Sequence, residues 1–219
     1  MADWDEGLRR VTIKIVYYGP ALSGKTTNLM RLHDLCATEQ VGEMMTLDTH
    51  NDRTLFFDLL PLGFHLPSGW LVKFKLYTVP GQVEHDSTRK ALLSRADGIV
   101  FVADSQRSQG VNNATAFESL ADNVGRVGLD FATLPMIVQF NKRDLPDVVS
   151  EEEIRARWDG TDWKVVLASA LRGAGVRETF AGLLERVFDD LVRHAEREAL
   201  AGTLRAEFVA AALGTQRGA

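Results

Sequence analysis

The sequence contains little cysteine and no excess of basic charge. Cys36 is the only cysteine among 219 residues, which excludes an internal disulfide and suits a reducing compartment, so we expect the cytoplasm. The 25 Lys and Arg residues stand against 30 Asp and Glu, a net charge of −5. No basic tract interleaves with aromatic residues, so we expect no nucleic-acid partner.

Long apolar runs are also absent. No stretch reaches the roughly 18 residues of a membrane-spanning helix, and no signal-peptide pattern opens the chain. The C-terminal residues Gln216-Arg217-Gly218-Ala219 offer no cysteine for prenylation, so we expect no direct membrane anchor. The five histidines show no metal-binding spacing. These absences leave a globular domain that needs no covalent staple, because a chain of this length buries about 70% of its unfolded surface.

One segment carries a specific chemistry. Residues 19–26 read G-P-A-L-S-G-K-T, which fits the phosphate-loop pattern G-x-x-x-x-G-K-[ST]. The loop follows an expected strand and opens an expected helix, so its backbone N–H groups and the positive end of the helix dipole would face phosphate oxygens. A chance glycine turn is the bland alternative, and the strand–loop–helix context makes it improbable. We assign phosphate and nucleotide contacts to Gly19, Pro20, Ala21, Leu22, Ser23, Gly24, Lys25, Thr26 and Thr27, with Lys25 stabilising phosphate charge and Thr26 binding Mg²⁺.

A second motif selects the base. The apolar run Pro135 to Phe140 is typical of a parallel strand and leads into N-K-x-D at Asn141 to Asp144. A carboxylate at Asp144 accepts from the adjacent N1–H and N2–H₂ donors of guanine, whereas adenine would meet it acceptor to acceptor. Asn141 would fix the loop, and Lys142 would lay its aliphatic stem across the purine. The ligand expected is therefore GTP or GDP with Mg²⁺.

A third, weaker segment completes the expected base site. Ser169-Ala170-Leu171 follows an apolar run, and the N–H of Ala170 is placed to contact guanine O6. The tripeptide is common, so it has weight only because of its position in the order of motifs.

Two loops are candidates for hydrolysis. Trp70 to Tyr77 alternates apolar and polar residues, which predicts a strand at or near a sheet edge, and it leads into Thr78-Val79-Pro80-Gly81-Gln82. We expect the N–H of Gly81 to meet a γ-phosphate and Gln82 to orient water, although an exposed loop glutamine is an equal alternative from this segment alone.

The other candidate loop lies between the first helix and that strand. Within Asp48 to Phe57, Thr54 would bind Mg²⁺ and the γ-phosphate, and Arg53 would act as an arginine finger supplied in cis. Spacing alone favours the alternative, in which Arg53 is a solvated loop charge.

These residues resemble the small Ras-like GTPases of the MglA type, bacterial regulators of polarity and motility. The likeness runs from about Ile13 to about Leu191 and is carried by residues 14–20, 52–58, 77–83, 102–105 and 141–146. Thr78 is typical of this type, because most Ras-like proteins have an aspartate there. The resemblance implies that Arg53 is an intrinsic finger and that Gln82 positions water. It also implies polarity effectors, an activating partner of the Roadblock (MglB-like) class, and possible recruitment to a cell pole by partners.

The chain departs from that type in three places. His50 and Glu84-His85 stand in switch loops that face partners, so the exact partner need not be the usual one. Ala21 stands where the family typically has glycine, and its methyl group would point toward the space that Gln82 and Arg53 must enter, so we expect a low basal rate. Residues 193–219 extend past the typical family end. Within them Leu200, Leu204, Phe208 and Ala211 or Ala212 would share a helix face. That face suggests docking or self-association, or equally a helix packed on its own domain.

The whole pattern predicts an α/β fold of the Ras-like P-loop class, a mostly parallel sheet with helices on both faces. We expect a tail over residues 1–10, the GTPase domain over 11–192 and a helical extension over 193–219. The predicted function is a GTP-hydrolysing switch. A GTP- or GDP-binding scaffold with negligible turnover is the alternative, and Ala21 is its main support. A phosphate-transferring kinase is disfavoured by the N-K-x-D motif. The expected strands cover residues 11–18, 44–47, 72–78, 98–103, 135–140 and 164–168, and the expected helices residues 25–39, 112–124, 151–158 and 176 onward.

Overall fold

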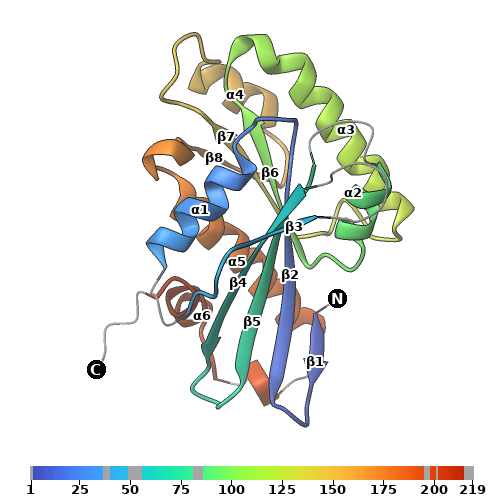
Figure 1. Cartoon of the computed structure of the whole chain (residues 1–219), viewed down its shortest axis with the longest axis vertical. Helices are drawn as coiled ribbons and strands as arrows, with labels where there is room; N and C mark the ends of the chain where they lie inside the picture. The colour runs from blue at the N-terminus through green and yellow to red at the C-terminus, as the bar shows by residue number, and fades with distance from the viewer. Residues whose placement is uncertain are drawn as a thin grey trace.

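An eight-stranded sheet runs through the molecule (Figure 1). The structure is a computed structural model, and it describes residues 2–36, 40–48, 56–80, 86–194, 198–200 and 202–214. The strand order is β3-β4-β5-β2-β6-β7-β8, and β1 pairs with β2 beside this path. The strands are β1 Asp3–Asp5, β2 Arg10–Tyr18, β3 Met45–Asp48, β4 Phe56–His65, β5 Leu71–Thr78, β6 Gly98–Asp104, β7 Met136–Asn141 and β8 Lys164–Leu167.

Strands β2, β5, β6, β7 and β8 are parallel, while β3, β4 and β5 pair antiparallel. The helices are α1 Lys25–Leu35, α2 Asp86–Leu93, α3 Gly110–Arg126, α4 Glu151–Trp158, α5 Val176–His194 and α6 Arg205–Ala212. In such a sheet the ligand site lies beyond the carboxyl ends of the parallel strands. The predicted Ras-like α/β fold is therefore confirmed.

Two apolar cores lie on opposite faces of the sheet. Helices α1, α5 and α6 supply one core, with Leu29, Phe180 and Phe208 fully buried. Helices α2, α3 and α4 supply the other, which contains Leu120 and Ile154. In Figure 1, α1 and α6 lie on one side of the sheet and α2 and α3 on the other. Because helices cover both faces, the central strand β6 is buried along its whole length.

The structure refines two expectations about the first half of the sheet. The alternating strand β5 is not at an edge, because β4 pairs with it on one side and β2 on the other. Its alternation arises from a sheet face that no helix covers there, since Lys73 and Lys75 are exposed while Phe74 is buried. Residues 3–5, expected in an N-terminal tail, form β1 and pair with β2, and Trp4 packs on Trp70 at 5.7 Å between ring centroids.

The C-terminal extension packs on its own domain. Phe208 of α6 is fully buried, with ring centroids 5.5 Å from Phe64 and 5.2 Å from Phe188. Leu204, expected on the same face, is 64% exposed and lies just before the helix. The apolar face of α6 is therefore occupied internally, which favours the alternative of a helix packed on its own domain over docking or self-association. The cause is a second layer of aromatic residues on β4 and α5 that the sequence pattern did not reveal.

Other elements match their expected positions. Helix α4 begins at Glu151 as predicted, because Ser150 and Glu153 form a reciprocal capping box. Gly202 adopts a φ of 75° between the short helical turn Glu198–Leu200 and α6. None of the helices in the described ranges has the length and apolarity to cross a bilayer.

Candidate nucleotide-binding site

The phosphate loop turns tightly between β2 and α1, and glycines permit the turn. Gly19 has a φ of 147°, and a Cβ there would lie 2.2 Å from the carbonyl oxygen of Val102. Gly24 has a φ of 98°, and a Cβ there would lie 2.3 Å from Nδ2 of Asn141. Because any side chain at either glycine would collide with a neighbour, the loop can pass this close to β6 and β7 only with glycine.

Lys25 is held in place without a ligand. Its Nζ donates to the carbonyl oxygens of Gly19 at 3.0 Å and Pro20 at 2.7 Å, so the loop curls around the ammonium group. Burial, together with the nearby charge of Arg89, lowers the pKa of Lys25 to about 8, and the charge of Asp58 opposes this change. A desolvated cation of this kind is stabilised by an anion, which is what a phosphate group supplies.

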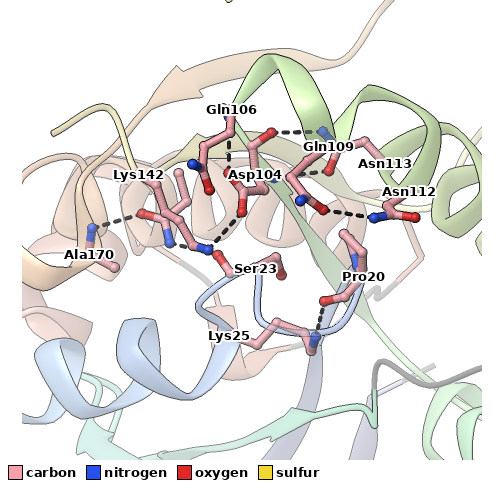
Figure 2. A network of polar contacts seen from close by, with 11 residues as sticks. Pro20, Ser23, Lys25, Asp104, Gln106, Gln109, Asn112, Asn113, Lys142 and Ala170 are labelled. Carbon is pink, nitrogen blue, oxygen red and sulfur yellow. Dashed lines mark hydrogen bonds and ion pairs between the residues drawn. The ribbon is translucent and has the colours of Figure 1, made fainter. Parts of the chain in front are cut away.

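Asn141 joins the phosphate loop to the base loops. Its Nδ2 donates to the carbonyl oxygen of Ser23 at 2.8 Å, and its Oδ1 accepts from the N–H of Ala170 at 2.8 Å (Figure 2). The side chain is buried, so both bonds are shielded from water. The three sequence motifs, which lie far apart in the chain, therefore meet at one residue. The N–H of Ala170, expected to face guanine O6, is engaged by Asn141 here.

An ion pair orients Lys142. The residue has a φ of 66°, and its Nζ contacts Oδ2 of Asp104 at 2.7 Å. The backbone N–H of Asp104 donates to Oδ1 of Asn113, and Nδ2 of Asn113 donates to the carbonyl oxygen of Asp104. Asn113 lies in the first turn of α3. Figure 2 shows this chain of contacts running from α3 to Lys142. The end of β6 indicates a structural or loop-orienting role for Asp104, but its partner Lys142 is 38 positions away and no sequence motif links the two residues.

Asp144 is positioned by Ser169. The hydroxyl of Ser169 donates to Oδ1 of Asp144 at 2.6 Å, and this hydrogen bond holds the pKa of the carboxyl below its usual range. The carboxylate is therefore charged at neutral pH and can only accept hydrogen bonds. The side chain of Leu171 is 65% exposed, and its carbonyl oxygen accepts from the guanidinium group of Arg31 on α1 at 2.8 Å.

A buried carboxylate that sequence analysis missed lies beside the phosphate loop. Asp58 of β4 is 7% exposed and accepts from the hydroxyl of Thr26 at 2.6 Å. Thr46 of β3 donates to its other oxygen at 3.1 Å, and Thr78 of β5 donates to Oδ2 at 2.9 Å. Thr78 stands where most Ras-like proteins have an aspartate, so the neighbouring strand carries the acid instead. That missing acid is the signal that points to Asp58.

The carboxylate of Asp58 and the hydroxyl of Thr26 are suitable ligands for a magnesium ion. Mg²⁺ prefers hard oxygen ligands and is commonly held by one or two carboxylates together with substrate phosphates. Asp58 and the Thr26 hydroxyl are within 2.6 Å of each other and face the phosphate loop, which meets this requirement. Within the described ranges no group of three His, Cys, Asp or Glu residues forms a protein-only metal cage. Arg53, Thr54, Gly81 and Gln82 lie outside the described residues, so their expected roles stay predictions.

Comparisons with known proteins agree with this geometry. Residues 6–187 match the sequence profile of the ADP-ribosylation factor family. The chain is 43% identical over 183 residues to the mutual gliding-motility protein MglA of Myxococcus xanthus, covering 84% of this chain and 94% of that protein. It is also 29% identical over 175 residues to elongation factor 4 of Streptococcus agalactiae, but there it covers only 27% of the relative.

Proposed function

Because the chain belongs to the ADP-ribosylation factor family, as a small GTPase of the MglA type, we propose that this GTP hydrolase is a switch in bacterial motility and polarity. The relative from Myxococcus xanthus carries gliding motility in its name, and nearly its whole length aligns with this chain. The observation that carries the proposal is the pair of hydrogen bonds made by Asn141. Those bonds join the phosphate loop to the N-K-x-D loop and the Ser169 loop, which supports one shared nucleotide site.

The described residues account for nucleotide binding. Lys25 and the N–H groups at the start of α1 stabilise phosphate charge, and α1 has no acidic residue in its first turn to oppose them. Asp144, held by Ser169, accepts from the guanine donors, while Lys142, held by Asp104, covers the purine. These contacts favour GTP and GDP over adenine nucleotides.

We assign the magnesium site to Thr26, Thr54 and Asp58. When bound, Mg²⁺ neutralises charge on the phosphates during transfer to water. The hydroxyl of Thr26 can turn from Asp58 toward the ligand, while the hydroxyls of Thr46 and Thr78 still hold the carboxylate in place. Asp58 replaces, from β4, the acid that is absent at Thr78.

Hydrolysis is assigned to Gln82 and Arg53. Gln82 would orient the attacking water, and Gly81 would bind the γ-phosphate through its N–H. Arg53 would stabilise transition-state charge from within the same chain, an effect of about 10³ to 10⁵ in rate where it operates. A Roadblock-domain protein of the MglB type is the proposed activating partner, and the cytoplasm, with recruitment to a pole by partners, is the proposed location.

The test is single-turnover hydrolysis of GTP with Mg²⁺, with and without a Roadblock-domain protein from the same genome. We expect the partner to raise the rate, and Arg53→Ala to lower it by about 10³-fold in both mixtures. Arg95→Ala is the matched control, because Arg95 is exposed and follows α2, and it should leave the rate unchanged.

Two outcomes would contradict parts of the proposal. An unchanged rate in Arg53→Ala would remove the finger in cis. Tight retention of GTP with no turnover in any mixture would favour the scaffold alternative, and Ala21→Gly would then show whether the extra methyl group blocks hydrolysis. Ala21 is exposed in the phosphate loop, so its replacement by glycine disturbs no core contact.

A further inference from the structure

A second polar cluster lies beneath the nucleotide site, and its three members are not among the expected ligand contacts. Asn28 of α1, Gln139 of β7 and Thr179 of α5 are each 0% exposed. They are surrounded by apolar side chains of the core that includes Leu29 and Phe180. Placing polar groups there costs free energy unless every group finds a partner, so their contacts require an explanation.

Every N–H and O–H of the three side chains donates a hydrogen bond. Gln139 Nε2 donates to Oδ1 of Asn28 at 2.8 Å and to Oγ1 of Thr179 at 2.8 Å. Asn28 Nδ2 donates back to Oε1 of Gln139 at 2.9 Å and to the carbonyl oxygen of Gly24 at 3.0 Å. The Thr179 hydroxyl donates to the carbonyl oxygen of Gly175 at 2.6 Å. The cluster is therefore a closed network with one preferred geometry.

The ends of this network lie on three nucleotide-binding segments. Asn28 is three residues after Lys25, and its bond to Gly24 reaches the phosphate loop itself. Gln139 lies two residues before Asn141 on the same strand. Thr179 reaches Gly175, which has a φ of 75° and ends the loop that begins at Ser169. The network thus links the supports of the phosphate loop, the N-K-x-D loop and the Ser169 loop.

We infer that Asn28, Gln139 and Thr179 are positioning residues that fix the spacing between the phosphate loop and the two base loops. A nucleotide gains affinity from both of its ends only if both binding loops are already at the correct separation, because otherwise part of the binding energy is spent on moving them. The inference rests on the proposed nucleotide site. It predicts that loss of the network lowers the affinity for whole nucleotides and changes the affinity for the base alone very little.

The triple variant Asn28→Leu, Gln139→Met and Thr179→Val tests this with little change in volume. The carbonyl oxygens of Gly24 and Gly175 keep a partner in this variant, because each also accepts from a backbone N–H, at positions 28 and 179 respectively, at 3.0 Å. We expect the variant to fold with a melting temperature at or above that of the wild type, since apolar replacement of a whole buried polar network is often neutral or stabilising. GDP affinity should fall about tenfold, while guanosine affinity should change less than twofold.

Two matched variants separate positioning from folding. Asn123→Leu makes the same change at a buried asparagine of α3 that contacts Tyr18 and Ser119 and no nucleotide loop, and it should leave the ratio of GDP to guanosine affinity unchanged. Thr179→Ser keeps the hydroxyl and should behave as wild type. Thr179→Val alone leaves one N–H of the Gln139 amide without an acceptor and should weaken GDP binding.

The outcomes are distinct. A wild type that binds neither GDP nor guanosine would remove the proposed function itself. A wild type that binds GDP, with a folded triple variant whose GDP to guanosine ratio equals the wild-type ratio, would overturn the positioning role. If the triple variant does not fold, Thr179→Ser and Thr179→Val decide, since equal GDP affinities in those two folded variants would also overturn it.

Discussion

The phosphate loop and the base loops are built in different ways. The phosphate loop depends on its own backbone, because its two glycines allow close passage and its carbonyl oxygens hold Lys25. The base loops depend on side chains from elsewhere, since Lys142 is held by Asp104 and Asp144 by Ser169. A loop held by its own backbone can be recognised from a short sequence pattern. A loop held by residues distant in the sequence can be recognised only once the fold is known. Asn141 is the point where the two designs meet.

The largest expected loss of GDP affinity comes from adding a side chain where the phosphate loop passes Asn141. Gly24→Ala places a methyl group 2.3 Å from Nδ2 of Asn141 and forces a φ of 98° on alanine. We expect GDP affinity to fall by about 100-fold or more, because the contact between the loops breaks, measured by calorimetric titration. Gly128→Ala has a φ of 76° and open space around the new methyl group, so it isolates the backbone cost of about 1 kcal/mol. Equal GDP affinities in the two variants would contradict the close-contact argument.

The second prediction concerns only the base side. Asp144→Asn replaces an acceptor by a group that also donates toward the guanine donors, so we expect GDP affinity to fall about 100-fold with ADP affinity unchanged. Asp147→Asn is the control, since this carboxylate is in the same loop but 79% exposed and next to Arg107. If both variants bind GDP equally well, Asp144 does not read the base.

The third prediction concerns only the phosphate side and uses pH. The pKa of Lys25 is lowered to about 8 without a ligand, and phosphate charge would raise it on binding. Binding therefore takes up a proton above about pH 8, and GDP affinity should fall up to tenfold between pH 8 and pH 9 while remaining flat from pH 6.5 to 7.5. The same lowered pKa means that charging Lys25 opposes folding of the free protein below about pH 8, a cost that fades as pH rises toward 10.5. In Lys25→Met the pH dependence of GDP affinity should vanish. If the dependence persists in this variant, a group other than Lys25 causes it.

The smallest effect tests the anchor of Lys142. Asp104→Asn removes the ion pair at 2.7 Å but keeps both backbone contacts to Asn113. GDP should dissociate about fivefold faster, as expected for one partly buried ion pair, in stopped-flow release of a fluorescent analogue. Asp122→Asn on the exposed face of α3 should release GDP at the wild-type rate. Matching rates in the two variants would show that Lys142 needs no anchor.

Most of the α/β core could be predicted because its signals are local. Strand β2, the phosphate loop and α1 follow one another within a short pattern, and Ser150 with Glu153 marks the start of α4. Strand β4 was missed because it contains Pro61 and Gly63, which disfavour strands. Its pairing with β3 and β5 on both sides stabilises it nevertheless.

The candidate site shows the same limit. Gly19, Lys25, Asn141 and Asp144 could be identified from motifs, but Asp58 could not, because its contacts with Thr26, Thr46 and Thr78 come from three different elements. The register of β3 on β4 places Thr46 opposite Asp58, and no sequence pattern encodes that register. For the same reason the sequence left two roles open for the α6 face, since Phe64 and Phe188 that cover Phe208 are distant in sequence.

Calorimetric titration of the wild-type protein with GDP and with ADP, each with Mg²⁺ at pH 7, tests the central claim most directly. The account predicts one GDP per chain, bound about 10⁴-fold more tightly than ADP, because Asp144 accepts from donors that adenine lacks. Equal affinities for the two nucleotides would contradict the assignment of one site formed by the phosphate loop and the base loops.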